Sequence, residues 1–155
     1  MPIEPGGYAV AKNEGDAWEM EPGRLAVFKL LATQTGGSVA VFEETVPVGV
    51  GTPLHIHRTS DEVLYVKSGT FTFQLGNEQE QVSAGYWIFI PLGSVHGWRN
   101  SGIEEGQLLN IFTPAAGAVA FEEMRLQGKP IPDVDPSVRD KIFDRNGYEF
   151  VTWDW

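Results

Sequence analysis

The sequence predicts an all-β protein, either an antiparallel sandwich or a barrel, that ends in short helices. Three observations lead to this prediction. Between Leu25 and Thr113 the chain alternates short runs rich in β-branched and aromatic residues with turns rich in Gly, Pro and Asn. No helical periodicity interrupts these runs, so consecutive strands are expected to pair antiparallel. Helix signals occur only after Pro114, in the last third of the chain.

The expected strands follow one another at short intervals. The first two runs are LAVFKLLAT and SVAVFEETV, separated by the turn sequence TQTGG, and a loop rich in Gly and Pro then leads into HIH. Next come DEVLYV, which ends at the turn KSG, and FTFQL, which ends at the hairpin signal Gly76-Asn77. The run EQV follows, then YWIFI, which is ended by Pro91. The segments VHGW and QLLNIFT complete the series.

Two helices are expected after the strands. The segment AAGAVAFEEMRLQ has a helical apolar periodicity and stops at Gly128. The second helix is predicted by Asp135 as its N-cap, by Pro136 at its first position and by the stop signal Asn146-Gly147. The aromatic tail EFVTWDW is interpreted as packing against a core edge or a homodimer seam, with a partner-binding patch as the alternative.

Length and composition favour one domain. A chain of 155 residues can bury a core without disulfides, and this one has no cysteine. The absence of cysteine also excludes thiolate metal ligands and cysteine nucleophiles. We expect a single domain over residues 1–155, with the barrel at about 25–114 and a helical extension at 115–155.

The charge pattern argues against nucleic acid and membrane partners. The formal net charge is −10, and the 11 basic residues are scattered along the chain rather than gathered in a stripe. The stretch MPIEPGGYAV lacks the basic and apolar segments of a signal peptide, and no apolar run reaches transmembrane length. The sequence therefore predicts a cytoplasmic protein that acts on, or binds, a small molecule.

Two of the three histidines, His55 and His57, stand one residue apart. Alternate residues of a strand face the same side, so these two imidazoles are expected to project together and could chelate one ion. Two neutral histidines in a polar barrel mouth would leave the same pattern. Glu62 favours the metal interpretation, because a carboxylate beside two imidazoles makes a mixed nitrogen and oxygen site that suits Zn, Fe, Mn, Co or Ni.

The spacing of these residues belongs to a longer pattern. The stretch from Gly49 to Gly69 reads G-x5-H-x-H-x4-E-x6-G, and the stretch from Gly85 to Asn100 reads G-x5-P-x-G-x2-H-x3-N. Together they resemble the two signature motifs of the cupin superfamily at every defining position. The resemblance implies a double-stranded β-helix, or jelly-roll, barrel that holds one divalent transition metal. Carried over to this sequence, the ligands it implies are His55, His57, Glu62 and His96.

The resemblance leaves the reaction open, because one barrel of this kind supports many chemistries. The segments LLATQTGGSVAVFEE and LLNIFTP, which flank the motifs, are similar to those of bacterial single-domain cupins described as quercetin dioxygenase-like. The leading interpretation is therefore a metal-dependent dioxygenase that acts on an enol-bearing or aromatic small molecule. The alternatives are a non-redox metal-dependent cyclase or isomerase of secondary metabolism or sugar chemistry, and a barrel that binds a small ligand without turnover.

Candidate roles follow for residues around the metal. Glu62 could accept a proton from the substrate, as the ligand glutamate does in flavonol dioxygenases, or serve only as a ligand. By strand alternation, Leu64 and Trp98 should point inward with Glu62, and Phe73 and Phe112 could do so from facing strands. For each aromatic residue, barrel core and substrate contact are both open interpretations.

A homodimer is expected as well. Single-domain cupin barrels resemble one another in pairing through edge strands, and the chain has apolar residues outside the motifs, among them Trp18, Phe28 and the aromatic tail. Asn100 is interpreted as a brace for the backbone rather than as a ligand.

Overall fold

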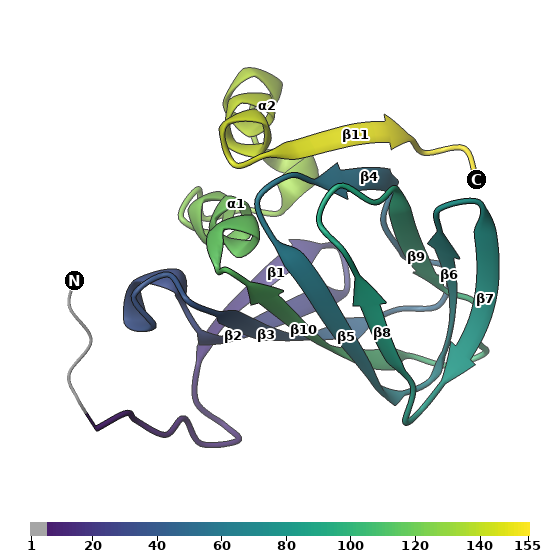
Figure 1. Ribbon diagram of the computed structural model, residues 1–155, viewed down its shortest axis with the longest axis horizontal. Coiled ribbons are helices and arrows are strands. Elements are labelled where there is room, and N and C mark those ends of the chain that lie inside the picture. The colour runs from purple at the N-terminus through teal and green to yellow at the C-terminus, as the bar shows by residue number, and fades with distance from the viewer. Residues whose placement is uncertain (1–5) are drawn as a thin grey trace.

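The computed structural model describes residues 6–155, so the first five residues of the stretch examined for a signal peptide lie outside it. Two antiparallel β-sheets face each other and form a barrel, and helices cover one end (Figure 1). The first sheet has six strands in the order β1-β2-β3-β10-β5-β8. Their bounds are β1 Asp16–Glu21, β2 Arg24–Leu30, β3 Ala40–Val46, β10 Gly106–Thr113, β5 Asp61–Ser68 and β8 Trp87–Ile90.

The second sheet has five strands in the order β11-β4-β9-β6-β7. Their bounds are β11 Tyr148–Thr152, β4 Leu54–His57, β9 His96–Asn100, β6 Thr70–Leu75 and β7 Glu78–Ser83. Because β4 and β5 follow each other in sequence but belong to different sheets, the short loop between them crosses from one sheet to the other. The predicted all-β barrel is confirmed, and each of the nine predicted runs forms a strand.

Two strands were not predicted. β1 precedes the expected start of the barrel and pairs with β2. β11 lies inside the segment expected to be a helical extension, and it pairs with β4 through Tyr148 opposite His57 and Phe150 opposite His55. The aromatic tail thus contributes an edge strand to the sheet that carries the histidines.

The two predicted helices are present. Helix α1 spans Ala116–Arg125 and helix α2 spans Pro136–Arg145. The carboxylate of Asp135 accepts a hydrogen bond from the amide of Ser137 at 2.9 Å, so it caps α2 as expected. Short 3-10 turns occur at Ala32–Gln34 and Ile131–Asp133. In Figure 1, both helices lie with β11 on one side of the barrel.

The apolar core has two parts. One fills the interior between the sheets and includes Leu64, Phe73 and Trp98. The other lies where the inner faces of β2, β3 and β10 meet the helices and β11, and it includes Phe112 and Tyr148. The candidate site lies beside Phe112 and Tyr148, because both rings pack against His57.

Asn100 braces the backbone, as predicted. Its Nδ2 donates to the carbonyl oxygens of Val46 and Glu104, each at 2.9 Å, and its Oδ1 accepts from the amide of Gly102 at 3.0 Å. One side chain therefore ties the end of β9 to β3 and to the loop that leads into β10. The side chain is 1% exposed, so these partners replace the water that it gives up on folding.

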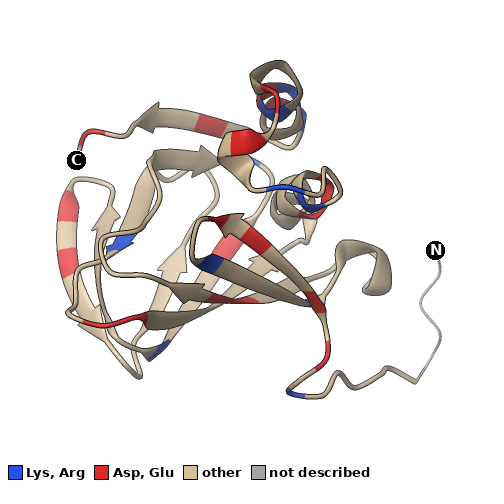
Figure 2. Ribbon diagram, turned by 180° about the vertical axis from the view of Figure 1, so that it is seen from behind, with Lys and Arg blue, Asp and Glu red and all other residues tan. Residues whose placement is uncertain are grey.

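The surface differs from the expectation in one respect. Trp18 and Phe28 belong to the buried core and are not spare surface for a dimer contact. Large aromatic residues are exposed instead on the edge strand β8, where Trp87 and Phe89 are 63% and 61% exposed. Figure 2 shows Lys and Arg residues distributed over separate elements. Within residues 6–155, neither helix has the length and apolar character needed to cross a membrane.

Candidate metal centre

Three buried histidines meet inside the barrel. His55 and His57 extend from the same side of β4, and His96 opens β9 directly opposite His55. The position of His96 depends on the turn before it, in which Gly93 adopts a positive φ of 86°. The amide of Gly93 donates to the carbonyl oxygen of His57 at 2.9 Å, so this turn is tied to the strand that carries the other two histidines.

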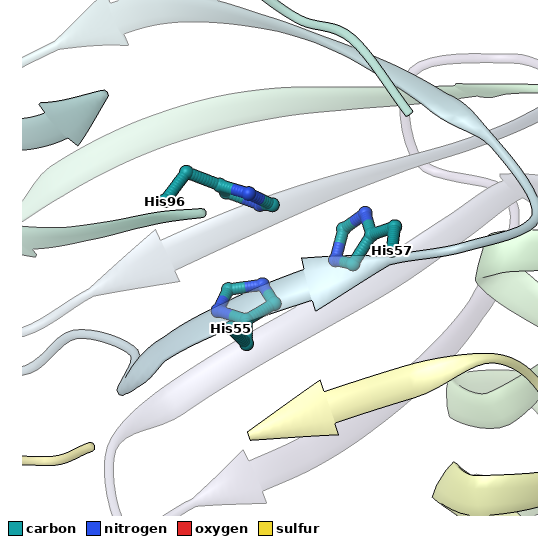
Figure 3. A group of neighbouring side chains, drawn as sticks. All are labelled: His55, His57 and His96. Atoms are coloured by element: carbon teal, nitrogen blue, oxygen red, sulfur yellow. The ribbon is translucent and has the colours of Figure 1, made fainter. Parts of the chain in front are cut away.

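The imidazoles converge on one point (Figure 3). One ring nitrogen from each of His55, His57 and His96 can be chosen so that all three atoms lie within 4.8 Å of one another. The ring centres are 4.2 Å apart for His55 and His96 and 4.8 Å apart for His55 and His57. Three nitrogens at this separation could hold a single ion.

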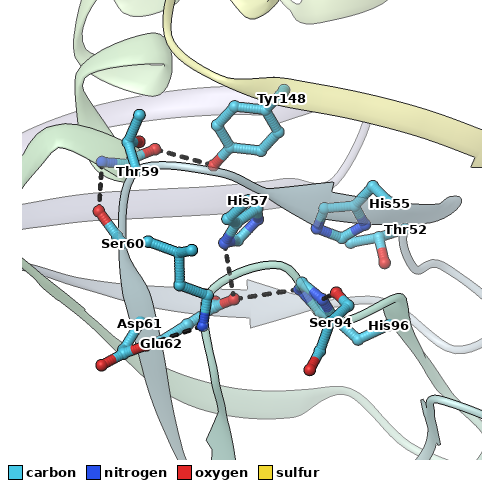
Figure 4. A network of polar contacts seen from close by, with 12 residues as sticks. Thr52, His55, His57, Thr59, Ser60, Asp61, Glu62, Ser94, His96 and Tyr148 are labelled. Carbon is cyan, nitrogen blue, oxygen red and sulfur yellow. Dashed lines mark hydrogen bonds and ion pairs between the residues drawn. The ribbon is translucent and has the colours of Figure 1, made fainter.

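Glu62, on β5, adds a carboxylate from the opposite sheet. Its Oε2 lies 3.5 Å from Nδ1 of His57 and 3.3 Å from Nε2 of His96 (Figure 4). Glu62 is 4% exposed, so its charge is removed from water and needs a compensating partner. The structure thus brings together all four side chains that the motifs imply.

Backbone carbonyls determine which histidine nitrogen is available. Nδ1 of His55 donates to the carbonyl oxygen of Pro53 at 2.8 Å, and Nδ1 of His96 donates to that of Ser94 at 3.0 Å. Nε2 of each ring therefore carries the lone pair that a metal needs. Within residues 6–155, Nε2 of His96 and both nitrogens of His57 have no hydrogen-bond partner. Buried polar atoms rarely stay unpaired, and one divalent ion would pair with Nε2 of His96 and with one of the two His57 nitrogens.

Burial also keeps the imidazoles of His55 and His57 neutral. Loss of hydration, with a smaller effect of His96, lowers the pKa of His55 to about 3. Burial, followed by the neighbouring histidines, lowers the pKa of His57 well below its ordinary value. Neutral imidazole is the form that binds metal ions. The donor set, the neutral imidazoles of His55 and His57, and the unpaired nitrogens all fit a divalent transition metal.

Comparison with known proteins identifies the family. A family model described as a cupin domain matches residues 42–112, the segment that contains all four converging side chains. An uncharacterized protein from Aquifex aeolicus is 34% identical over 106 residues, which cover 68% of this chain and 78% of that protein. The chain belongs to the cupin superfamily.

Solved structures support the same fold. KdgF from Halomonas sp. superposes with a TM-score of 0.62 at 21% identity, over 70% of this chain and 94% of that one. A candidate sugar phosphate isomerase from Acidithiobacillus ferrooxidans superposes with a TM-score of 0.52 at 25% identity, over 66% of this chain and 69% of that one. Cupin barrels with such different names share an architecture, so membership of the family does not by itself specify a reaction.

In this cupin, a cavity of about 430 Å³ is lined in part by His55 of the candidate metal centre. Most of its wall comes from the chain after the barrel. The aromatic residues of that wall are Phe121, Phe143, Tyr148, Phe150 and Trp153. The Tyr148 hydroxyl donates to the carbonyl oxygen of Gly117 at 2.9 Å, and its ring centre lies 4.6 Å from that of His57. Burial raises the pKa of Tyr148 well above its ordinary value, so its phenol stays protonated.

The residues predicted to contact substrate lie elsewhere. Leu64, Phe73 and Trp98 are at most 3% exposed inside the barrel, and none of them lines this cavity. Phe112 does not line it either, but its ring centre is 5.2 Å from that of His57, so it supports a candidate ligand. Strand alternation gave the inward direction correctly, but inward-facing side chains at these depths fill the core.

Sequence reasoning missed the aromatic wall. Phe150 and Trp153 belong to the tail EFVTWDW, whose predicted role is packing at a core edge or a dimer seam, and Tyr148 directly precedes that tail. The available signal was the density of aromatic residues in that tail. The pairing of β11 with β4, which brings the tail to the histidines, has no local signature in the sequence.

Proposed function

We propose that this cupin is a metal-dependent enzyme, and that it oxygenates an enol-bearing or aromatic small molecule held in the cavity beside His55. One observation supports the proposal above all others. Three buried imidazoles and the Glu62 carboxylate converge, and one of these side chains, His55, lines a cavity walled by aromatic side chains. Such a combination of a candidate metal centre and an apolar pocket is typical of an enzyme site for a small molecule.

The four converging side chains would hold the ion. A divalent cation among three neutral imidazoles and one carboxylate keeps a net charge of +1, counting +2 for the ion and −1 for Glu62, which favours an anionic oxygen of the substrate. Such an ion supplies Lewis acidity toward that oxygen, and a redox-active ion also permits reaction with dioxygen.

The protein's own residues would position the substrate and exclude water. The aromatic wall offers flat apolar surfaces on which a planar molecule can stack. Glu62 lies within 3.5 Å of two histidines, so it could accept the proton that an enol loses on binding. The Tyr148 hydroxyl is occupied by the carbonyl oxygen of Gly117, and the residue therefore serves as a wall rather than as an acid.

A non-redox reaction is the second candidate. The structural similarity to the candidate sugar phosphate isomerase, at 25% identity, favours it. In this case the ion would stabilise an enolate, and the reaction would not consume dioxygen. The four converging side chains would serve equally well as ligands for such an ion. Binding of a small ligand without turnover would also use the same cavity.

Oxygen consumption separates these functions. Protein loaded anaerobically with iron, manganese, nickel or cobalt would be mixed with flavonols and related enols, and dioxygen uptake would be followed with an electrode. Uptake that requires both metal and substrate supports the oxygenase. Conversion of a substrate without dioxygen replaces it with the cyclase or isomerase, and binding without conversion under any metal leaves a binding protein.

A further inference from the structure

A buried arginine borders the cavity but does not belong to the metal centre. Arg24 begins β2, is 5% exposed and lines the cavity together with His55. Its Nη2 donates to Oε1 of Glu44 at 2.7 Å, and its guanidinium carbon lies 4.9 Å from the ring centre of Trp98. These contacts fix the guanidinium in one place, which is the condition for a selective binding group.

The buried pair keeps unused hydrogen-bonding capacity. Nε of Arg24 and Oε2 of Glu44 are buried, and neither has a partner among the described residues. Glu44 is 2% exposed and does not line the cavity, so its role is to hold Arg24. Arg24 does line the cavity, and its accessible donor is Nη1, which makes no hydrogen bond within the described residues and is not among the buried unpaired atoms. An oxygen of whatever molecule fills that space can accept from this nitrogen.

The local charge limits the kind of oxygen that is accepted. Besides Glu44, Glu21 also faces the guanidinium, with Oε2 at 3.7 Å from Nη1 of Arg24. Burial alone would lower the pKa of Arg24, but Glu44 and Glu21 together raise it above its ordinary value, so it stays charged. Two carboxylates around one guanidinium leave a formal charge of −1, which repels a further anion and leaves an uncharged oxygen as the suitable acceptor.

We propose that Arg24 is a specificity-determining residue that binds a hydroxyl or carbonyl oxygen of the substrate, at the end remote from the metal-binding atoms. The inference rests on the proposed function, because it takes the other end of the molecule to lie at the histidines. It narrows the substrate class to small enols that carry an uncharged oxygen substituent far from the enol.

Matched ligands can test this without turnover. Allomaltol, kojic acid and comenic acid are hydroxypyranones with the same chelating end, and they carry a methyl, a hydroxymethyl and a carboxylate group at the same remote carbon. A longer pair, 3-hydroxyflavone and 3,7-dihydroxyflavone, differs by one remote hydroxyl. Their affinities for the zinc-loaded protein would be measured by calorimetry, since zinc is redox-inert. In at least one pair, the ligand with the extra hydroxyl should bind about tenfold more tightly, the effect of a hydrogen bond to a charged donor. Comenic acid should bind no more tightly than kojic acid.

Variants assign the preference to Arg24. Arg24→Lys keeps a charge beside Glu44 but has a single terminal nitrogen, so it lacks the separate Nη1 donor. Arg24→Met with Glu44→Met removes the pair without leaving a lone buried charge. In both variants, the ligands with and without the extra hydroxyl should bind with about equal affinity. Arg139→Met is the control, because Arg139 lines the same cavity from α2, and it should keep the preference.

The outcomes separate this inference from the proposed function. A preference that survives in both Arg24 variants overturns the inference, as does an equal loss of affinity for both members of a pair. Wild-type protein that holds zinc but shows no preference, or binds none of the ligands, also overturns it. Elemental analysis that finds no metal in the wild-type protein contradicts the proposed function itself.

Discussion

Breaking the buried ion pair should destabilise this cupin far more than removing it altogether. Arg24 and Glu44 are 5% and 2% exposed, and the atoms that join them are 2.7 Å apart. Arg24→Met leaves the Glu44 carboxylate buried without its cation, which should cost about 3–5 kcal/mol of unfolding free energy. For a domain of this length, such a loss lowers the melting temperature by roughly 6–20 °C.

The double variant provides the contrast. Arg24→Met with Glu44→Met replaces both charges by apolar side chains of similar length, so its stability should be close to that of the wild type or higher. Chemical denaturation of the three proteins at pH 7.5, followed by fluorescence, measures these differences. A loss below about 1 kcal/mol in Arg24→Met, as expected for an exposed pair, would refute the reasoning.

The single variant should also depend on pH in a defined direction. Burial already raises the pKa of Glu44 above its ordinary value of 4.5, and loss of Arg24 removes the main opposing effect. In Arg24→Met the folded protein therefore keeps the Glu44 proton at pH values where the unfolded chain has released it. Stability relative to the wild type should be highest below pH 4.5 and should fall as the pH rises. If the difference in unfolding free energy between Arg24→Met and the wild type does not change between pH 4 and 7, this explanation is contradicted.

Four further predictions concern the site and the assembly. The purified protein should carry about one divalent transition metal per chain, and elemental analysis should find it lost in His55→Ala and in His96→Ala. Glu62→Gln should retain some metal while turnover falls by about 10²-fold or more, the range for loss of a general base; unchanged kcat would assign Glu62 a purely structural role. In chelator-treated protein, the unfolding free energy should decrease as the pH falls from about 6.5 toward 3, because unfolded His55 protonates near 6.5 and folded His55 only near 3. A pH-independent urea midpoint over that interval would contradict this. Light scattering at micromolar concentration should give the mass of a dimer, and a monomer would show that the exposed aromatic residues of β8 serve another purpose.

The candidate ligands could be predicted because their placement depends on local geometry. His55 and His57 share a side of β4 by strand alternation, and the Gly93 turn, which follows Pro91, leads directly to His96. Glu62 lies across the short loop between β4 and β5. Each relation is carried by a few consecutive residues, so the spacing of the motif contains it.

The cavity wall could not be predicted in the same way, because it depends on pairing between distant segments. Tyr148 reaches His57 only after the two helices have turned the chain back and β11 has paired with β4. Alternation also fails to distinguish the depth of an inward-facing residue. Trp98 points inward and is core, whereas Phe150, on a strand that the sequence did not predict, borders the cavity. Only the tertiary arrangement separates these two outcomes.

Under the proposed function, the candidate metal ligands and the residues that would select the substrate lie in different parts of the chain. The segment that the family model matches, residues 42–112, contains every candidate metal ligand. The aromatic wall at Phe121, Phe143 and Trp153 follows that segment, and Arg24 precedes it. Similarity within the matched segment can consequently identify a metal-binding barrel, but it contains no information about the residues that would select the substrate. If the chain after Pro114 is exchanged for the corresponding segment of another cupin, the chimaera should bind different molecules while the candidate metal ligands stay in place. An unchanged ligand preference in such a chimaera would assign selectivity to residues inside the barrel.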